Sequence, residues 1–302
     1  MRHFFARSWN RVRSSRLRTF YERLPPATKA LYRQASHWPA TAAWRRSPMG
    51  QAHAVRVLAP RRNQYSGRRA VIMGNGPSLR KTDWSKVRDE FTFGTNRIYL
   101  LKEEMGFSPS VYCCVNSLVL EQFHREMIDL PGLKLLDWRA GRRFVPPDSQ
   151  TVFLPEAPSM RFHRDLLTGW TLGYTVTMAA LQAAFYLGFQ TVILIGVDHR
   201  FGTRGPAMRE VRLEGEDRDH FAPDYFGYGV RWHLPNLAGS ERFYEAARSA
   251  YVAEGRQILD ATDGGALEVF PKMSLEEALH RSAPARDGHA LQASAQPVQR
   301  AL

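Results

Sequence analysis

The sequence predicts an α/β protein with a Rossmann-like, doubly wound fold, in which helices cover both faces of a mostly parallel sheet. Short apolar runs alternate with helical stretches from residue 68 onward. The run "TVILIGVD" (191–198) is almost entirely apolar, which is typical of a central strand covered on both faces. The preceding "GYTVTMAALQAAFYLG" (173–188) has the length of a crossover helix, and Gly188 supplies its C-terminal stop.

The same two patterns place the other elements along the chain. Runs of four to seven residues rich in β-branched, aromatic and aliphatic side chains predict strands at 69–73, 91–95, 110–115, 133–137, 151–154, 191–197 and 257–261. Longer stretches with helical spacing of apolar residues predict helices at 97–105, 117–128, 173–187, 240–254 and 274–280. No internal repeat interrupts this alternation.

We expect three parts: a basic N-terminal leader (1–66), a Rossmann-like domain (67–280) and a tail (281–302) that has no periodicity and should be disordered. The net charge is +13, yet residues 1–70 hold 16 of the 42 Lys and Arg and a single acid, Glu22. The remaining 26 basic and 28 acidic residues nearly balance. A nucleic-acid-binding domain would carry the basic charge on its own folded surface, so we expect no nucleic-acid partner for the domain.

The leader mixes arginines with apolar side chains. A loose helical face could be formed by Phe4, Phe5, Trp9, Val12 and Leu17. Such a basic amphipathic helix suits an anionic lipid surface, whereas a solvated arm and a nucleic-acid-binding arm remain alternatives. The N-terminus lacks a secretory signal pattern, and no apolar run reaches 18 residues. We therefore expect a cytoplasmic protein, peripheral at the inner membrane face.

The two cysteines are adjacent, Cys113 and Cys114, in the apolar run "SVYCCVN". Neighbouring cysteines rarely bridge each other, so we interpret them as reduced core residues, with a catalytic thiol as the alternative.

The first expected strand of the domain runs into a tight polar loop, Gly74-Asn75-Gly76-Pro77-Ser78. Loops at the carboxyl ends of parallel strands bind ligands, and glycines let backbone N–H groups approach an anion. Ser78 could cap a helical turn or donate to phosphate. The loop matches neither the dinucleotide fingerprint nor a P-loop, and a plain turn is the alternative.

Further polar residues follow other expected strands. Asn96 and Asn116 end the second and third strands, so they should meet the glycine loop at one edge of the sheet. Each asparagine could instead simply cap the next helix. Gly196 and Asp198 end the central strand.

The long polar segment "GEDRDHFAPDYFGYG" (215–229) suggests an active-site loop or lid. It contains His220, which could accept a proton from a hydroxyl nucleophile. The alternative is that His220 is an ordinary surface residue of the loop.

Taken in order, these motifs resemble bacterial sialyltransferases of glycosyltransferase family 42 and, equally, the MptE-like proteins named for archaeal 6-hydroxymethylpterin diphosphokinase. The resemblance covers about residues 68–280. It is carried by "GNGPSL", "GTNRIYL", "VNSLVLEQF", the stretch 171–201 and "DHFAPDYFG".

The sialyltransferase resemblance implies a CMP-sugar donor. It implies that Asn75 and Gly76 hold the donor phosphate and that Asn96 and Asn116 contact the nucleotide sugar. It also implies that His220 is the general base. The positions that match the family's "T-S-G" segment beside the donor are Thr171 and Gly173.

The chain departs from the sialyltransferase pattern in three places. Leu172 replaces the serine of "T-S-G", and Gly169 stands where the family has an arginine. Where the family uses tyrosines to stabilise the leaving phosphate, this sequence offers Arg200 and Arg204.

The resemblance to sialyltransferases implies a metal-independent transferase that moves a sialic-acid-like (nonulosonic) sugar from a CMP donor to a glycan hydroxyl, without a cofactor. One alternative is a diphosphokinase that transfers pyrophosphate from ATP to a pterin-like alcohol, with Mg²⁺ held by acids such as Asp198, Asp217 or Asp219. Another is a non-catalytic nucleotide-binding module at a membrane surface.

Overall fold

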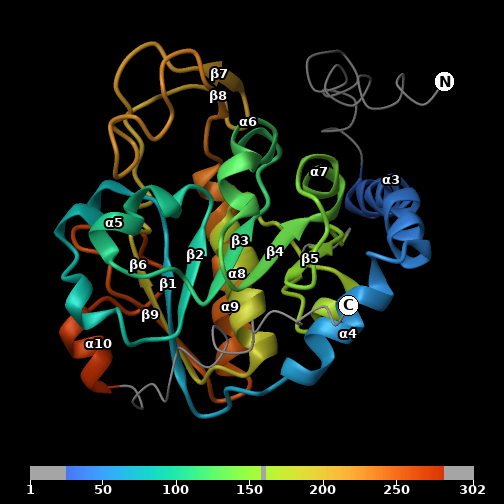
Figure 1. The fold of residues 1–302 in the computed structure, drawn as a ribbon, viewed down its shortest axis with the longest axis horizontal. Coiled ribbons are helices and arrows are strands. Elements are labelled where there is room, and N and C mark those ends of the chain that lie inside the picture. The colour runs from blue at the N-terminus through green and yellow to red at the C-terminus, as the bar shows by residue number, and fades with distance from the viewer. Residues whose placement is uncertain (1–24, 158–160, 282–302) are drawn as a thin grey trace, which may run out of the picture.

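The fold is seen in a computed structural model that describes residues 25–157 and 161–281. Seven strands form one sheet in which all neighbours are parallel (Figure 1). From one edge to the other they are β5 (Thr151–Leu154), β4 (Leu133–Asp137), β3 (Val111–Cys114), β2 (Thr92–Thr95), β1 (Arg69–Met73), β6 (Thr191–Ile195) and β9 (Gln257–Asp260). The predicted doubly wound α/β fold is confirmed.

Helices pack against this sheet and against its edge. In chain order they are α3 (Pro26–Arg46), α4 (Gln51–Leu58), α5 (Lys102–Met105), α6 (Ser117–Ile128), α7 (Trp138–Phe144), α8 (Val176–Leu187), α9 (Leu237–Val252) and α10 (Leu275–Arg281). Between β6 and α9 the chain makes a long excursion that contains a short antiparallel ribbon of β7 (Glu210–Arg212) and β8 (Arg231–His233). Figure 1 shows this excursion beyond the end of the sheet from which α6 starts.

The crossover helix α8 is buried along its whole length and packs on β1, β2 and β3. An apolar residue at almost every position is what such burial requires. The helix begins at Val176 rather than at the predicted residue 173, because Gly173 and Tyr174 have left-handed φ values of 57° and 63°. It ends at Gly188, as predicted, where φ is 99°.

Residues before the expected domain boundary belong to the packed body. Trp44 is fully buried, and its indole Nε1 donates to the Phe153 carbonyl of β5 at 2.8 Å. His53 of α4 bonds the Thr151 carbonyl of the same strand through Nε2 at 3.1 Å. An edge strand has unpaired carbonyls, so these side chains cover the free edge of β5. Trp44 and His53 therefore pack on the body of the protein, although both precede the expected boundary at 66.

The two cysteines lie at the end of β3 and are fully buried as free thiols. Burial raises the pKa of Cys114 to about 12, so this thiol stays neutral near pH 7. The interpretation of both cysteines as reduced core residues fits this environment, and the catalytic-thiol alternative does not.

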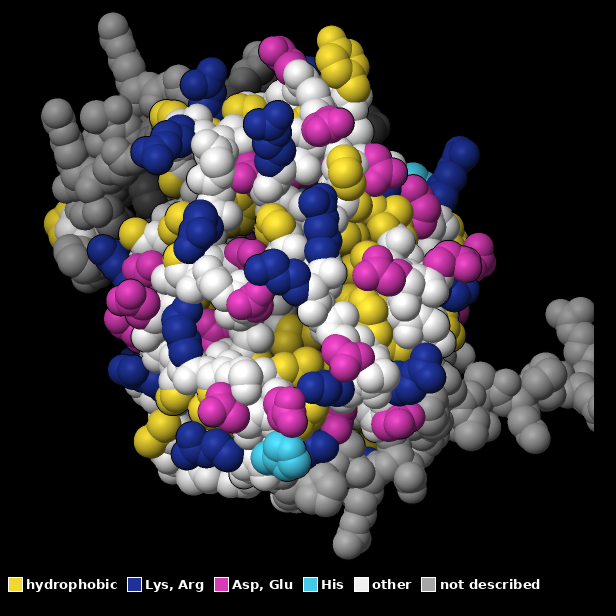
Figure 2. All heavy atoms as spheres, turned by 90° about the vertical axis from the view of Figure 1, so that its left-hand side faces the viewer, with side chains coloured by type: hydrophobic (Ala, Val, Ile, Leu, Met, Phe, Trp, Pro, Cys, Tyr) yellow, Lys and Arg dark blue, Asp and Glu magenta, His cyan; other side chains and the backbone are white. Residues whose placement is uncertain are grey.

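The surface of the body carries both signs of charge. Figure 2 shows basic and acidic side chains interspersed over the face that it presents. This distribution agrees with the near balance of charges beyond residue 70. Within residues 25–157 and 161–281, no helix combines the length and the apolar character needed to cross a membrane. The expected lipid-facing residues Phe4 to Leu17, and the tail after Arg281, lie outside the described residues.

Candidate functional site

The carboxyl ends of three adjacent strands bring the predicted polar residues to one edge of the sheet. The glycine loop follows β1, Asn96 follows β2 and Asn116 follows β3, and these strands are hydrogen-bonded neighbours in parallel register. Open α/β sheets bind ligands at this edge. The excursion that contains His220 lies over the same edge (Figure 1).

The two glycines of the loop make room for the protein itself. A Cβ on Gly74 would lie 2.2 Å from the Gly196 carbonyl oxygen, and one on Gly76 would lie 1.8 Å from Asp198 Oδ2. The N–H of Gly74 donates to the Ile195 carbonyl and that of Gly76 to the Gly196 carbonyl, each at 2.8 Å. The loop after β1 is therefore packed tightly on the loop after β6.

Asp198 occupies the place where an anion was expected. Ser78 donates its backbone N–H to Asp198 Oδ1 at 3.1 Å and its hydroxyl to Oδ2 at 2.7 Å. These donors, with the N–H of Gly76, are satisfied by protein oxygens. In this conformation the loop that was predicted to cradle a phosphate, with Gly74, Gly76 and Ser78, binds a carboxylate of the protein.

The three asparagines differ in how much of their hydrogen-bonding capacity is used. Asn116 caps α6, with Oδ1 accepting from the N–H groups of Leu118 and Val119. Asn75 donates from Nδ2 to Thr95 Oγ1 at 2.8 Å, but its Oδ1 is enclosed and has no partner in the described part of the chain. Asn96 adopts a left-handed φ of 46°, and its carbonyl accepts from the hydroxyl of Tyr112.

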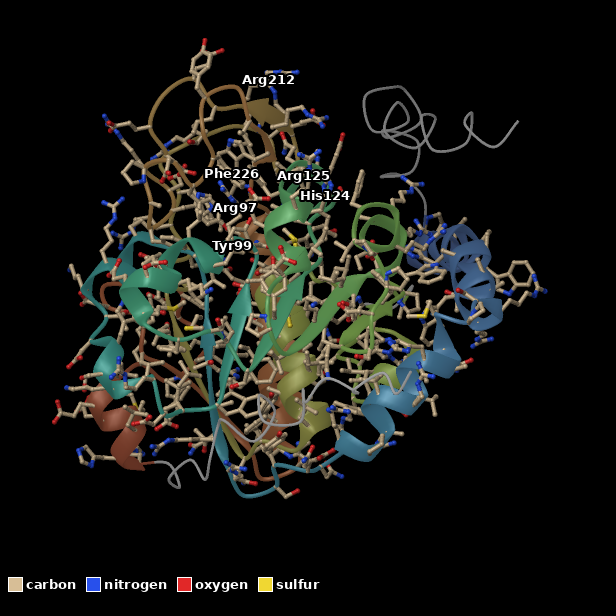
Figure 3. The ribbon with its side chains drawn as sticks, in the orientation of Figure 1. Arg97, Tyr99, His124, Arg125, Arg212 and Phe226 are labelled. Atoms are coloured by element: carbon tan, nitrogen blue, oxygen red, sulfur yellow. The ribbon has the colours of Figure 1, made fainter. Side chains whose placement is uncertain are left out.

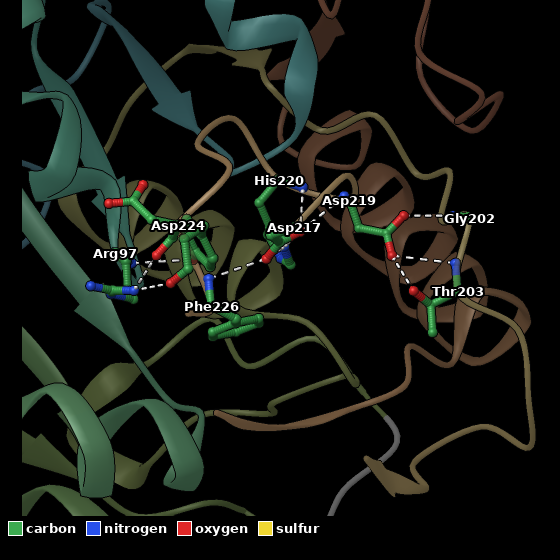
Figure 4. A network of polar contacts seen from close by, with 9 residues as sticks. Arg97, Gly202, Thr203, Asp217, Asp219, His220, Asp224 and Phe226 are labelled. Atoms are coloured by element: carbon green, nitrogen blue, oxygen red, sulfur yellow. Dashed lines mark hydrogen bonds and ion pairs between the residues drawn. The ribbon is translucent and has the colours of Figure 1, made fainter. Parts of the chain in front are cut away.

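His220 forms a buried pair with the carboxylate of Asp217. The sequence predicted Asp217 only as a possible ligand of Mg²⁺. His220 Nδ1 lies 3.0 and 2.9 Å from the two carboxylate oxygens of Asp217. Asp217 is 4% exposed and also accepts the N–H groups of Asp219, His220 and Phe226 at 2.9, 3.1 and 3.2 Å (Figure 4). An ionised carboxylate at this position favours the tautomer with the proton on Nδ1, which leaves the lone pair on Nε2.

Aromatic rings fix the plane of the imidazole. The ring of Tyr225 stacks on His220 with centroids 4.1 Å apart and planes 2° apart. Phe226 and Trp232 meet the imidazole edge-on at 4.9 and 6.0 Å. Burial raises the pKa of the Tyr225 phenol well above its ordinary value, so Tyr225 serves as a neutral wall rather than as a base.

The His220 segment is attached to the glycine loop. The N–H of Phe221 donates to the carbonyl of Asn75 at 3.1 Å, and Arg80 Nε donates to the carbonyl of Phe221. Asn75 and His220 are 145 positions apart in the sequence. The backbone bond from Phe221, the residue after His220, to Asn75 holds the two segments together.

Arg97, which the sequence analysis did not single out, lies between β2 and the His220 segment. It is only 7% exposed, and its Nη1 donates to the backbone carbonyls of Asp224 and Tyr225. Its guanidinium carbon lies 3.8 Å from the ring centroid of Phe123. The sequence could have indicated Arg97 through its position directly after Asn96, the residue that ends the strand.

Three predicted site residues, Arg200, Thr171 and Gly173, bond to or pack on parts of the chain other than the glycine loop and His220. Arg200, predicted to lie beside the leaving phosphate, is exposed, and its guanidinium bonds the Gly264 carbonyl in the loop after β9 at 3.2 Å. Thr171 and Gly173 are buried. The hydroxyl of Thr171 donates to the Arg161 carbonyl, and Gly173 packs on Met178 and Phe243. Neither presents a surface for a donor in this conformation.

The acids proposed for Mg²⁺ do not gather around one ion. Asp198 binds Ser78, Asp217 binds His220, and Asp219 accepts from Gly202 N–H and from the N–H and hydroxyl of Thr203. Among the described residues no group of three or more His, Cys, Asp or Glu side chains has a geometry that could hold a metal ion. These acids do not fit a protein-built magnesium site.

A pocket of about 300 Å³ opens elsewhere on the described surface. It is lined by Glu241, Glu245, Arg248, Ala266, Glu268 and Val269, none of which the sequence analysis predicted as a site residue.

The chain is similar to known proteins in both structure and sequence. The chain matches the structure of MAf glycosyltransferase from Magnetospirillum magneticum AMB-1 at 17% identity with a TM-score of 0.45, over 80% of this chain and 40% of that one. The chain thus spans less than half of that protein. No curated protein matches the chain. The family model described as 6-hydroxymethylpterin diphosphokinase MptE-like matches residues 50–204, which includes the glycine loop, the strand-ending asparagines and α4. The chain belongs to the MptE-like family.

Proposed function

We propose that this protein is a transferase in which His220 removes the proton from an acceptor hydroxyl. The observation that carries the proposal is the pair of His220 Nδ1 and the Asp217 carboxylate at 2.9 Å, held on the glycine loop at the carboxyl edge of the sheet. Membership of a family named for a diphosphokinase agrees with transfer chemistry. Both the preferred reaction and its alternative require a nucleophilic hydroxyl.

The proposed chemical step balances as a single displacement. His220 Nε2 takes the proton of the acceptor hydroxyl while Nδ1–H stays bonded to Asp217, which stabilises the resulting imidazolium. The acceptor oxygen bonds to the anomeric carbon of the sugar as the bond from that carbon to the phosphate oxygen breaks. CMP departs with the electron pair, and the configuration at the anomeric carbon inverts.

We assign the donor to the amides at the strand ends. Within the described residues, no hydrogen bond engages Nδ2 of Asn96 or Nδ2 of Asn116, and Asn75 Oδ1 has no partner. Uncharged amides suit the hydroxyl groups of ribose and the edges of a pyrimidine. A CMP-linked nonulosonic sugar is therefore our preferred donor, and a glycan hydroxyl our preferred acceptor. Neither Ser78 nor Arg200 is retained as a phosphate ligand.

The family match favours a second candidate, transfer of pyrophosphate from ATP to a pterin-like alcohol. His220 would deprotonate that alcohol in the same way. The acids Asp198, Asp217 and Asp219 already accept hydrogen bonds from the protein, so they would not supply a ready-made ligand set for Mg²⁺. For this reason we rank the diphosphokinase second.

We further propose that the basic segment ahead of residue 44 contacts anionic lipid, which would place the enzyme at the inner membrane face. The test is sedimentation with vesicles of phosphatidylglycerol and phosphatidylcholine. Binding should require the anionic lipid, should weaken in 0.5 M salt as electrostatic contacts do, and should be lost on deletion of residues 2–24. Equal binding to neutral vesicles would contradict it.

The function is tested with the purified chain and candidate donors. CMP release from CMP-N-acetylneuraminate in the presence of lactose, without metal, supports the first candidate. Magnesium-dependent AMP release from ATP with 6-hydroxymethyl-7,8-dihydropterin supports the second. In either assay His220→Gln should lower kcat by about 10²–10⁴. Full activity in this variant, with the substitution confirmed by mass, would refute the assignment of the base.

A further inference from the structure

Arg97 carries a positive charge into the interior without an acidic partner. Its side chain belongs to a residue that is 7% exposed, and no carboxylate within the described ranges forms an ion pair with it. Buried charges in proteins are normally paired, because removing an ion from water costs several kcal/mol. We propose that Arg97 is the binding residue for an anionic group, a phosphate or a carboxylate, on the substrate of the site described above.

The contacts of Arg97 leave one end of its guanidinium unused. Nη1 donates to the backbone carbonyls of Asp224 and Tyr225, and Nε lies 3.3 Å from the hydroxyl of Tyr99. In Figure 4 the bond to Asp224 is to its backbone, and among the described residues no ion pair joins the Asp224 carboxylate to Arg97. No partner engages Nη2 in the described part of the chain, and Nη2 is not among the fully enclosed polar atoms without a partner. Nη2 is therefore not fully enclosed by the protein.

The surroundings of Nη2 favour an anion rather than a neutral ligand. Phe123 covers one face of the guanidinium at 3.8 Å, which keeps the charge at low dielectric and strengthens its attraction for an oxyanion. Figure 3 shows Arg97 and Tyr99 below Phe226, with Arg125 near the upper end of α6 and Arg212 farther out on β7, whereas His124 stacks on Phe144 of α7. Within the described ranges, neither Arg125 nor Arg212 forms an ion pair with an acid. The outer arginines would draw an anion toward Arg97.

Neighbouring backbone strain points to the same spot. Asn96 has a left-handed φ of 46°, an arrangement that is uncommon outside glycine and that clusters at binding sites. Because Asn96 turns the chain there, its amide and the guanidinium of Arg97 leave the end of β2 together. A ligand that places an oxyanion on Arg97 would therefore lie beside the Asn96 amide and on the same sheet edge as His220.

This inference rests on the proposed function, since it assigns the charged part of the same substrate. The phosphate of a CMP donor, the pyrophosphate of ATP and the carboxylate of a nonulosonic sugar all present the required oxyanion. Arginine binds such groups through charge-assisted hydrogen bonds. Arg97 thus replaces the loop donors as the phosphate ligand of the site, because Asp198 engages those of Ser78 and backbone carbonyls engage those of Gly74 and Gly76.

The test measures the affinity of the full chain for CMP and for cytidine, which lacks the phosphate, by calorimetry. Wild type should bind CMP about 10- to 100-fold more tightly than cytidine, as expected for a charged hydrogen bond. Arg97→Met should reduce this ratio to nearly one, and Arg97→Lys should restore part of it. Because the ratio compares two ligands on one sample, partial unfolding of a variant does not change it. Arg164→Met is the matched control, since Arg164 pairs with Glu254 away from the site.

The outcomes separate this proposal from the function on which it rests. If neither nucleoside nor nucleotide binds, the CMP donor is wrong, and the same variants are then titrated with inorganic pyrophosphate and with N-acetylneuraminate. Loss of either anion in Arg97→Met, with binding kept in Arg164→Met, still supports the anion site and identifies its source. A CMP-to-cytidine ratio that survives in Arg97→Met overturns the proposal, as does a wild-type chain that binds no anion at all.

Discussion

Asp217 is the residue whose replacement tests the mechanism most directly. Its carboxylate accepts four hydrogen bonds: Oδ1 accepts from the N–H groups of Asp219 and His220, and Oδ2 accepts from Phe226 N–H and His220 Nδ1. In Asp217→Asn one oxygen remains, and it can keep the bonds at Oδ1. The amide NH₂ then takes the position of Oδ2 and faces two donors.

Two consequences of Asp217→Asn have estimable sizes. Phe226 N–H is buried and loses its acceptor, which costs about 1–3 kcal/mol and lowers Tm by about 2–12 °C in a domain of this size. The amide NH₂ beside Nδ1 also favours the tautomer in which Nδ1 accepts a hydrogen bond, in competition with the 3.0 Å contact of Nδ1 with the retained Oδ1. The proton then lies on Nε2, the position that has to remove a proton from the acceptor, and kcat should fall about 10²–10⁴-fold.

The assay pairs kinetics with an observation that needs no substrate. Long-range ¹H–¹⁵N spectra of histidine-labelled protein report the tautomer of His220, assigned with His220→Gln, and the signal should switch from Nδ1–H to Nε2–H in Asp217→Asn. Asp219→Asn is the matched control: it disturbs the same loop at Gly202 and Thr203 but has no contact with the imidazole. An unchanged tautomer in Asp217→Asn, or an equal loss of kcat in Asp219→Asn, would refute the reasoning.

Three further predictions concern stability. Gly76→Ala should destabilise the ligand-free protein by more than about 2 kcal/mol, because its Cβ would lie 1.8 Å from Asp198 Oδ2. In a double-mutant cycle measured by urea unfolding, Asp198→Ala should relieve most of that loss of stability, and additive losses would contradict this explanation. Burial raises the pKa of Asp137 from 3.8 to about 6, so the folded state holds this proton more tightly and stability should fall by up to about 3 kcal/mol as the pH rises from 4 to 6. Asp137→Asn, which keeps an acceptor for Ala140 N–H, should remove that slope in urea titrations at pH 4.5 and 7, and an unchanged slope would show that Asp137 is not its source. Trp44→Phe should lower the free energy of unfolding by about 1 kcal/mol through the lost hydrogen bond to Phe153, and Trp44→Ala by about 3–5 kcal/mol. Thermal unfolding measures both, and no change in either variant would mean that α3 does not stabilise the edge of β5.

Local patterns were sufficient to predict the sheet. The strands at 69–73, 133–137 and 151–154 have the bounds expected from their apolar runs, because burial on both faces leaves little freedom in which residues can form them. The strand expected at 191–197 stops at Ile195, because Gly196 turns the chain with a φ of 67°. Helix α9 starts three residues earlier than predicted, since the side chain of Asn236 caps it by accepting from Gly239 N–H.

The candidate site was less accessible to sequence reasoning, because its contacts join residues far apart in the chain. The approach of the His220 segment to the glycine loop was expected, but the pairing of Arg97 with Tyr225, 128 positions later, leaves no local pattern. Asp217 and His220 are three residues apart, yet their spacing in an irregular loop has no fixed geometry, so Asp217 could equally have been a metal ligand.

The glycine loop shows that a sequence motif need not bind the ligand that the motif suggests. Glycines at the carboxyl end of β1 permit a close approach, and the sequence does not say by what. Here the approaching group is the loop after β6, with Asp198 accepting the donors of Ser78. A second negative charge beside that carboxylate would be repelled, so an anionic ligand is favoured farther along the edge, toward β2. Arg97 lies there, directly after Asn96 in the chain and within the same network as His220. This is why we place the charged end of the substrate on β2 rather than on the glycine loop.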